Sequence, residues 1–272
     1  MRAPIGVFDS GVGGLTVLAA LRRHLPHESF LYLGDTARLP YGTKSASTVA
    51  RYARQTARVL VDRGAKLVVI ACNTASAVAL EDLAVHLAPL PVLGVIEPGA
   101  AAACAASPTG RIAVIGTDST IRGGAYERAI ARRRPEARVL GRPCPLFVAL
   151  AEEGWCEGPI AEAVAQRYVG DLRRTGDDPE AIDCLVLGCT HFPVLRGAIE
   201  AAVGPEVILV DSAETTAKAV HQVLERKGLA TDAEGPGDIT LLATDGPERF
   251  ARAGARFLGL PLRPGAVSLV DL

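Results

Sequence analysis

Apolar runs of strand length alternate along the chain with longer segments in which apolar residues recur at helical spacing. Leu15, Leu18 and Leu21, for example, fall on one side of a helix that ends at Pro26. The predicted strands, in order, are PIGVF, FLYLG, LVVIA, VLGVI, RIAVIG, RVLG, CLVLG, VILVD, ITLLAT and AVSLV. The predicted helices cover about 15–25, 46–63, 75–88, 121–133, 159–174, 194–203 and 214–227, and two more follow Gly99 and Pro247.

Most of the predicted strands are continuous apolar runs, instead of alternating between apolar and polar positions. Helices must then cover both faces of the sheet, which is typical of a mostly parallel, doubly wound α/β fold. Ligands of such folds gather beyond the carboxyl ends of the strands. The residues that directly follow each strand are therefore the candidates for chemistry.

Two segments of the chain echo each other. LVVIACNTASA and CLVLGCTHFPV each place an apolar strand, a small residue, a cysteine and a threonine ahead of a predicted helix. Buried strands often resemble one another, but the echo favours two similar α/β lobes that face each other across a central cleft.

Charge and hydropathy exclude several function classes. The 272 residues include 29 Lys and Arg against 30 Asp and Glu, a formal charge of −1, which leaves no basic excess for a nucleic-acid partner. No apolar run approaches the roughly 20 residues of a membrane span. The N-terminal MRAPIGVFDSG lacks the apolar stretch and cleavage site of a signal peptide. We therefore expect a cytoplasmic protein with no membrane partner.

Glycine-rich and polar loops follow the first two strands. Asp9 and Ser10 open FDSGVGGLT, whose glycines allow an anion to approach a helix N-terminus, although a simple tight turn explains them as well. The segment lacks the lysine of a P-loop and the spacing of GxGxxG. Asp35, Tyr41 and Gly42 lie in GDTARLPYGTKS, which is too polar for the core and is either a functional loop or a solvated turn.

The cysteines carry the sharpest signal. The six include no C-x-x-C pair, which disfavours zinc, and we expect no metal site. Cys72 and Cys189 lie where a predicted strand gives way to a helix, a position that lowers the pKa of a thiol. Hydrogen-bonding side chains follow each of them, Asn73 and Thr74 in the first case, Thr190 and His191 in the second. We assign Cys104, Cys144, Cys156 and Cys184 to packing.

Segments along the whole chain resemble the motifs of a known family. GVFDSGVGGLTVL, GDTARLPYG, IACNTASA, GVIEPG, GTDSTI, PLFVALAEEGW, LGCTHFPVL and DSAET are similar, in this order, to the successive motifs of the glutamate racemases. The match spans nearly the whole chain, and the paired CNT and GCTH are its more specific elements.

The resemblance implies a racemase that uses two thiols and no cofactor. Cys72 would exchange a proton with D-glutamate and Cys189 with L-glutamate, on opposite faces of the α-carbon. Asp9 resembles the auxiliary carboxylate near Cys72, and His191 the auxiliary base near Cys189. Glu152 resembles a further polar residue at the second thiol, with its neighbour Glu153 as the competing alignment.

The resemblance also implies which residues bind the substrate. Hydroxyl and amide groups suit the carboxylates and the ammonium group of glutamate. The implied substrate-binding residues are Asp9, Ser10, Asp35, Tyr41, Gly42, Asn73, Thr74, Thr117, Thr120, Thr190 and His191. Gly123 stands where family members often carry Ser, a departure that affects local hydrogen bonding and not the thiols.

Organisation and biological role follow from the same resemblance. We expect one lobe from 1–96 plus 211–272 and a second from 97–210, with a crossing at the Pro98–Gly99 punctuation. We further expect a homodimer that supplies D-glutamate for cell-wall peptidoglycan. Some relatives carry an N-terminal extension linked to control by a wall precursor; because this chain begins at its first strand, we do not expect that form of control.

Three other functions remain open from the residues. A racemase for aspartate or another small amino acid would also use paired thiols. A thiol hydrolase would use one cysteine as nucleophile and His191 as base, which leaves the second cysteine unexplained. A two-lobed binding protein would gain nothing from matched thiols at two strand ends.

Overall fold

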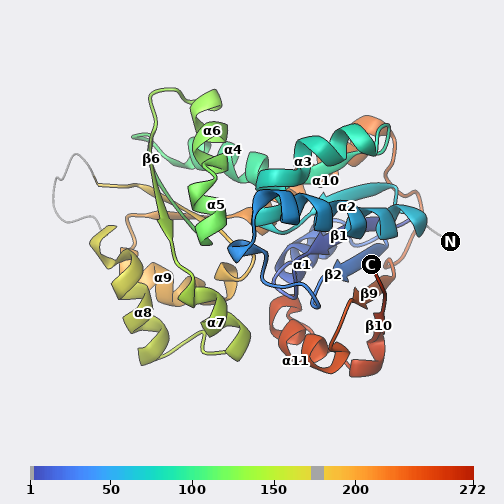
Figure 1. Ribbon diagram of the computed structural model, residues 1–272. Coiled ribbons are helices and arrows are strands. Elements are labelled where there is room, and N and C mark those ends of the chain that lie inside the picture. The colour runs from blue at the N-terminus through green and yellow to red at the C-terminus, as the bar shows by residue number, and fades with distance from the viewer. Residues whose placement is uncertain (1–2, 173–180) are drawn as a thin grey trace. The chain divides into compact units, whose positions relative to one another are not determined.

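The structure, a computed structural model, describes residues 3–172 and 181–272. The chain forms two compact units (Figure 1). The first unit comprises Met1–Val95 and Ala213–Leu272, and the second comprises Ile96–Ser212. Each unit is an α/β layer structure built around its own parallel sheet, which confirms the predicted fold class.

The first unit contains a six-stranded sheet in the order β10-β9-β2-β1-β3-β4. Its described strand pairs are all parallel, and β1 lies between β2 and β3 with Ile5 opposite both Phe30 and Leu67. The strands are β1 (Ile5–Asp9), β2 (Phe30–Gly34), β3 (Leu67–Ile70), β4 (Val92–Gly94), β9 (Ile239–Ala243) and β10 (Val267–Leu269).

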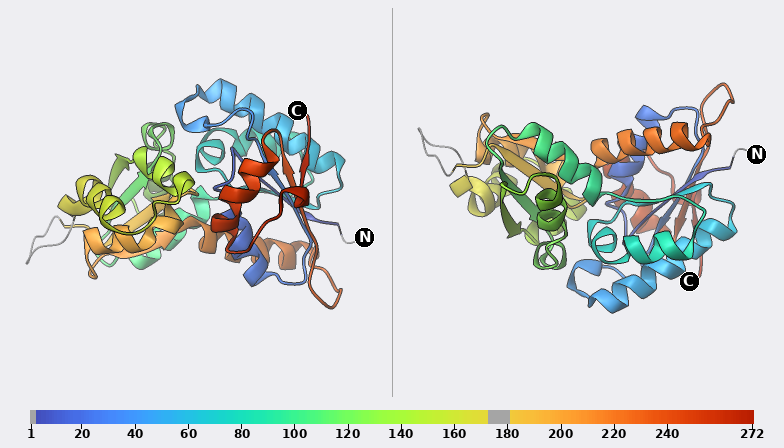
Figure 2. Two further views of the ribbon diagram at one scale, coloured as in Figure 1. Left: turned by 90° about the horizontal axis from the view of Figure 1, so that it is seen from below. Right: turned by 90° about the horizontal axis from the view of Figure 1, so that it is seen from above.

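Helices cover both faces of this sheet. In both views of Figure 2, α2 and α3 lie on one face, and α1 and α10 lie on the other. The helices are α1 (Leu15–His24), α2 (Ala46–Asp62), α3 (Asn73–His86), α10 (Ser212–Lys227) and α11 (Pro247–Leu258), with short 3₁₀ turns at Tyr41–Thr43 and Pro264–Ala266.

The continuous apolar strands are buried because of this double cover. All five residues of β1 and all five of β2 are buried. Alternate side chains such as Phe8 and Leu33 enter a core with Leu60 of α2 and Leu83 of α3. A strand buried on both faces has no solvent side to mark with polar residues, which accounts for the sequence pattern.

The second unit contains a four-stranded parallel sheet in the order β6-β5-β7-β8. In Figure 1, α4 and α6 lie on one side of this sheet and α8 and α9 on the other. The strands are β5 (Arg111–Gly116), β6 (Arg138–Pro143), β7 (Cys184–Gly188) and β8 (Ile208–Asp211). The helices are α4 (Ile96–Ala106), α5 (Asp118–Arg122), α6 (Ala125–Arg133), α7 (Leu146–Glu153), α8 (Pro159–Val169) and α9 (Arg196–Val203), with 3₁₀ turns at Gly170–Leu172 and Phe192–Leu195.

The two sheets share one winding pattern. The order β2-β1-β3-β4 in the first unit corresponds to β6-β5-β7-β8 in the second. In each, the chain leaves the central strand to one side and later returns to its other side, which creates a switch point between β1 and β3 and between β5 and β7. The echo between the two cysteine segments therefore reflects equivalent strands, β3 and β7.

Several element boundaries differ from the sequence predictions. The single helix expected at 121–133 is two helices, because Gly124 takes a left-handed conformation (φ 60°) that separates α5 from α6. The sequence pattern did not predict α7, a helix of only 8 residues. Helix α4 begins at Ile96, ahead of Gly99. The helix predicted at 159–174 ends at Val169, and positions 173–174 lie outside the described residues.

Candidate functional site

The first unit places a glycine-rich loop at the carboxyl end of β1. Asp9 ends the strand, is fully buried, and accepts a hydrogen bond at Oδ2 from the Gly11 N–H at 2.9 Å. The hydroxyl of Tyr32 donates to the Gly11 carbonyl at 2.9 Å. A Cβ at Gly14 would come within 2.5 Å of the Asp9 Cβ. The loop is thus pressed against Asp9, and only glycine fits at that position.

Cys72 lies beside this loop. It is the N-cap of α3, two residues after β3 ends, and 6% of its surface is exposed. Its Sγ accepts a hydrogen bond from the Ala75 N–H at 3.5 Å and lies 3.7 Å from the Ser10 hydroxyl oxygen. The predicted position at a helix N-terminus is confirmed for this thiol, and α3 directs its positive end toward the sulfur.

Four further sequence candidates lie on the first unit near these strand ends. Asn73 and Thr74 form the first turn of α3 and are both buried. Tyr41 and Gly42 form the 3₁₀ turn that follows β2. Burial, and then the charge of Asp35, raises the pKa of the Tyr41 hydroxyl far above its ordinary value, so that it remains protonated.

Cys189 directly follows β7 in the second unit. It is 6% exposed, and its Sγ lies 3.8 Å from Nδ1 of His191. Nε2 of His191 lies 3.3 Å from Oε1 of Glu152, on α7. Thr190, which lies between Cys189 and His191 in sequence, is buried. The structure therefore groups Glu152, His191 and Cys189, the three residues predicted to lie around the second thiol.

The surroundings of Cys189 differ in one respect from the sequence prediction. The chain after Cys189 enters a 3₁₀ turn at Phe192–Leu195, and α9 begins only at Arg196. Cys189 is therefore not the N-cap of an α-helix, in contrast to Cys72. The Pro193 ring in this turn lacks an N–H donor, which favours a short turn ahead of the helix. The His191–Glu152 pair supplies polar groups at this thiol instead.

Thr117 and Thr120 lie at the carboxyl end of β5. Thr117 is the N-cap of α5, and its hydroxyl accepts a hydrogen bond from the Thr120 N–H at 3.4 Å. The two hydroxyl oxygens are 3.1 Å apart. Both threonines thus occupy the switch point of the second sheet, next to the strand that precedes Cys189. Gly123 forms the C-cap of α5.

Each thiol also has a buried tyrosine that the sequence analysis did not select. Burial, and then Asp9 and Cys72, raises the pKa of Tyr32 well above its usual value. Burial likewise raises the pKa of Tyr126, a hydrogen bond with Ser212 opposes the rise, and Cys189 adds to it. Both hydroxyls therefore stay protonated. The sequence around each tyrosine predicts only a core residue, and no local motif indicates a functional role.

The other buried thiols are in surroundings that keep them neutral. Burial raises the pKa of Cys144 to about 12, with Arg142 lowering it and Cys189 raising it. Burial also raises the pKa of Cys184 to about 12. A thiol with such a pKa carries no thiolate near neutral pH, so neither residue is suited to proton abstraction.

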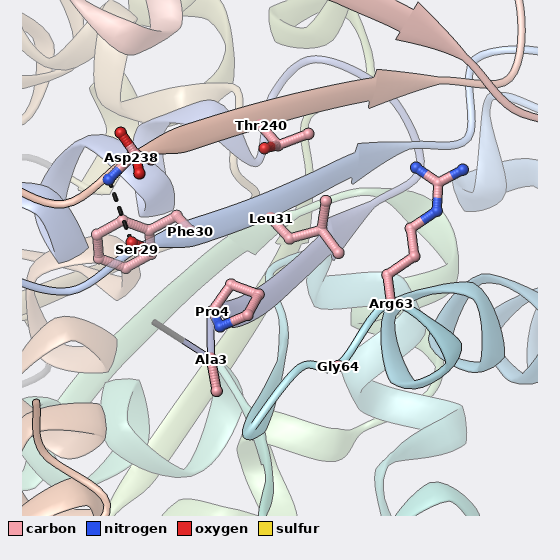
Figure 3. A pocket seen from close by; sticks show the side chains of 9 residues that line it. All are labelled: Ala3, Pro4, Ser29, Phe30, Leu31, Arg63, Gly64, Asp238 and Thr240. Atoms are coloured by element: carbon pink, nitrogen blue, oxygen red, sulfur yellow. Dashed lines mark hydrogen bonds between the residues drawn. The ribbon is translucent and has the colours of Figure 1, made fainter. Parts of the chain in front are cut away.

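The pocket drawn in Figure 3 belongs to the opposite edge of the first sheet. Phe30 and Thr240 lie at the amino ends of β2 and β9, and Asp238 donates its backbone N–H to the Ser29 hydroxyl at 3.2 Å. None of the candidate site residues lines this pocket. It is therefore distinct from the strand ends that carry the thiols.

The described residues contain neither a metal-binding cluster nor a membrane-spanning helix. Within 3–172 and 181–272, no three His, Cys, Asp or Glu side chains are grouped so that they could hold a metal ion. In the same part of the chain, no helix combines the length and the apolar character needed to cross a membrane.

Comparison with known proteins identifies the class to which this fold and these residues correspond. The family model for Asp/Glu/Hydantoin racemases matches residues 15–220. The matched segment includes both thiols, His191 and Glu152. The chain therefore belongs to the Asp/Glu/Hydantoin racemase family.

Relatives that match the chain over nearly its whole length are glutamate racemases. The glutamate racemase of Geobacter metallireducens is 52% identical over 94% of this chain and 92% of its own. The Thermus thermophilus enzyme, solved with beta-chloro-D-alanine, superposes with a TM-score of 0.87 at 47% identity and covers 100% of this chain and 98% of its own. The Francisella tularensis enzyme, solved with D-glutamate, gives 0.89 at 36% identity over 99% and 98%.

Proposed function

We propose that this chain interconverts L- and D-glutamate by passing the α-proton between two thiols. The observation that carries the proposal is the equivalent placement of Cys72 and Cys189, each at the carboxyl end of the strand beyond the switch point of its own sheet. A racemase needs one group to remove a proton from one face and another to return a proton to the opposite face. Two matched thiols meet that need.

The proton transfer balances without any further reactant. The thiolate of one cysteine takes the α-proton and becomes a thiol, and the electron pair of the C–H bond stays on the substrate. The thiol of the other cysteine gives its proton to the opposite face and becomes a thiolate. The substrate is inverted, and the two cysteines have exchanged protonation states. In our proposal Cys72 exchanges with D-glutamate and Cys189 with L-glutamate, with no cofactor.

Different auxiliary groups serve the two thiols. At Cys189, His191 is the neighbouring base, and Glu152 orients its ring through the 3.3 Å contact. At Cys72, Asp9 is the auxiliary carboxylate, and it also holds the glycine loop through Gly11. The two thiols therefore have different auxiliary groups, His191 at Cys189 and Asp9 at Cys72, although the strands that carry the thiols are equivalent.

Most of the remaining candidates bind the substrate in this proposal. The hydroxyl of Ser10 and the first turn of α3, at Asn73 and Thr74, suit a carboxylate, because the dipole of a helix favours negative charge at its N-terminus. Tyr41 and Gly42 contribute from the loop after β2. Thr117, Thr120 and Thr190 contribute hydroxyls from the second unit. These donors would also stabilise the negative charge that develops when the α-proton leaves.

The biological setting is proposed from the family. D-Glutamate would be supplied to cell-wall peptidoglycan synthesis, the enzyme would act in the cytoplasm, and it would act as a homodimer. Full-length similarity to glutamate racemases supports the first two statements.

The direct test is a polarimetric assay of both glutamate enantiomers without added cofactor. We expect each to racemise, and aspartate to react at least about a hundredfold more slowly, because a shorter side chain leaves the binding groups unpaired. Cys72→Ser and Cys189→Ser are each expected to lower the rate more than about a thousandfold. A covalent acyl intermediate, detected by mass spectrometry, would support the hydrolase alternative instead.

A further inference from the structure

A single hydroxyl joins the loop after β2 to the loop after β9. The two strands are parallel neighbours with Gly34 opposite Ala243, so the residues that follow, Asp35 and Thr244, are adjacent. Oγ1 of Thr244 donates to Oδ1 of Asp35 at 3.0 Å and accepts the N–H of Ala37 at 2.9 Å. One threonine side chain therefore fixes both a side chain and the backbone of the facing loop.

The other carboxylate oxygen of Asp35 holds Tyr41. Oδ2 accepts hydrogen bonds from the Tyr41 hydroxyl and from Nε of Arg38, the latter at 2.7 Å. Asp35 is fully buried and Tyr41 is 1% exposed, so the hydrogen bond between these two side chains is shielded from water. Asp35 thus bonds to three side chains of the protein and would repel an anionic substrate. It is better suited to placing Tyr41 than to touching glutamate.

Further contacts hold the loop between Asp35 and Tyr41. Oγ1 of Thr36 accepts the N–H of Asp245 at 2.8 Å and donates to the Asp245 carbonyl at 2.5 Å. The Arg38 guanidinium lies 4.1 Å from the centre of the Tyr52 ring, which in turn lies 5.7 Å from the Tyr41 ring. The β9–α11 loop therefore acts as an anchor for the whole turn that presents Tyr41 and Gly42.

We propose that Thr244 is a positioning residue for substrate binding, acting through Asp35 on Tyr41. Thr244 lies beyond residues 15–220, which the family model matches, and carries no motif that marks it in sequence. The inference rests on the proposed function, because it takes the Tyr41–Gly42 turn as part of the substrate site.

The test makes the same substitution at Thr244, which directly follows β9, and at Thr240, near the amino end of that strand. Thr244→Val removes the hydroxyl and keeps the shape of the side chain. We expect the KM for D-glutamate to rise about five- to tenfold and kcat to change less than about twofold, because the lost bond serves binding and not proton transfer. Thr244→Ser restores a hydroxyl, and its KM is expected to return to within about twofold of the unmodified protein.

Thr240→Val is the matched control. Thr240 is exposed at the amino end of the same strand, in the pocket of Figure 3, away from Asp35. Its KM is expected to stay within about twofold, because no hydrogen bond to the Tyr41 loop is removed. Circular dichroism and thermal unfolding establish that each variant is folded, and Thr244→Ala repeats the test should valine disturb the fold.

Two outcomes overturn the inference in an active enzyme. One is a KM for folded Thr244→Val, or Thr244→Ala, no higher than that of Thr240→Val. The other is a Thr244→Ser variant as impaired as the valine variant, since the hydroxyl would then not be the cause. Failure of the unmodified protein to racemise glutamate would instead contradict the proposed function, so the two failures are distinguishable.

Discussion

Oε1 of Glu152 lies 3.3 Å from Nε2 of His191, although 39 residues separate them in sequence. The other ring nitrogen, Nδ1, lies 3.8 Å from Sγ of Cys189. The imidazole therefore has a carboxylate on one side and the thiol on the other. The carboxylate can therefore orient the ring beside the thiol.

Replacing Glu152 is expected to weaken catalysis through His191. Glu152→Gln keeps the size of the side chain but removes its charge, and we expect kcat/KM to fall about tenfold. Because L- and D-glutamate have equal free energies in solution, kcat/KM must fall equally in both directions. Initial rates measured from each enantiomer check this.

Glu153→Gln is the control for this substitution. Glu153 is exposed on the same helix, one residue further along, and the sequence alone did not distinguish it from Glu152. Its kcat/KM is expected to stay within about twofold. Equal losses in the two variants would show that the contact with His191 does not matter.

The backbone approach at Gly34 predicts a loss of stability. A methyl group there would lie 2.4 Å from the Gly11 carbonyl oxygen and 2.8 Å from Cε2 of Phe250. Gly34→Ala is expected to lower the free energy of unfolding by about 2–4 kcal/mol, because the glycine loop beside Asp9 must shift. Urea unfolding at 25 °C measures this, and KM is expected to rise as the loop moves.

Gly197→Ala serves as the comparison. Gly197 lies in α9 with no atom within 4 Å of the added Cβ. Its free energy of unfolding is expected to stay the same or rise by up to about 1 kcal/mol, because alanine favours the helix. If Gly34→Ala and Gly197→Ala have the same free energy of unfolding, the close backbone approach at Gly34 does not limit stability.

Much of the fold could be predicted from the sequence, because the strands carry a strong and continuous apolar signal. Cys72 and Cys189 could be selected for the same reason: each follows such a strand, and a thiol after a buried strand is conspicuous. The separation of α5 from α6 was not predictable from periodicity, since it depends on the left-handed conformation of Gly124.

Contacts between distant segments set the limit of prediction at the site. Tyr32 and Tyr126 each interact electrostatically with one of the thiols, but each is embedded in an apolar pattern that predicts only core. The link from Thr244 to Asp35 spans 209 residues and depends on the pairing of β2 with β9. Strand order decides these contacts, and no local pattern in one sequence contains it.

Asp183 predicts a specific dependence of stability on pH. Burial alone would raise its pKa, but hydrogen bonds from Ser107 and Thr109 outweigh that effect and hold the pKa below its usual value. A carboxylate with a lowered pKa stabilises the fold above its unfolded pKa of about 3.9, and this stabilisation is lost as pH falls through the lower folded value.

Asp183→Asn is therefore expected to lower the free energy of unfolding by about 1–3 kcal/mol at pH 6 and by less at pH 3. Urea unfolding at the two pH values gives the difference, with Asp232→Asn at an exposed position as the control. A destabilisation that does not shrink at pH 3 would show that the charge of Asp183 contributes nothing.

Cys184 is expected to be dispensable for catalysis. Its thiol is buried at the amino end of β7, away from Cys189, and burial raises its pKa to about 12. Cys184→Ala is expected to keep kcat/KM within about twofold, at a cost of about 1 kcal/mol in stability from the lost packing. A loss of more than about tenfold in a folded variant would contradict the assignment of this thiol to packing.

Deuterium uptake during the first few per cent of reaction tests the two-thiol account most directly. Each glutamate enantiomer is incubated with the protein in D₂O. Product and remaining substrate are then separated, and the deuterium content of each is measured by mass spectrometry. If Cys72 and Cys189 act on opposite faces, the product carries one deuterium at the α-carbon while the remaining substrate keeps its hydrogen. Product that retains the substrate's own α-hydrogen would show that a single base serves both faces, and the account would be wrong.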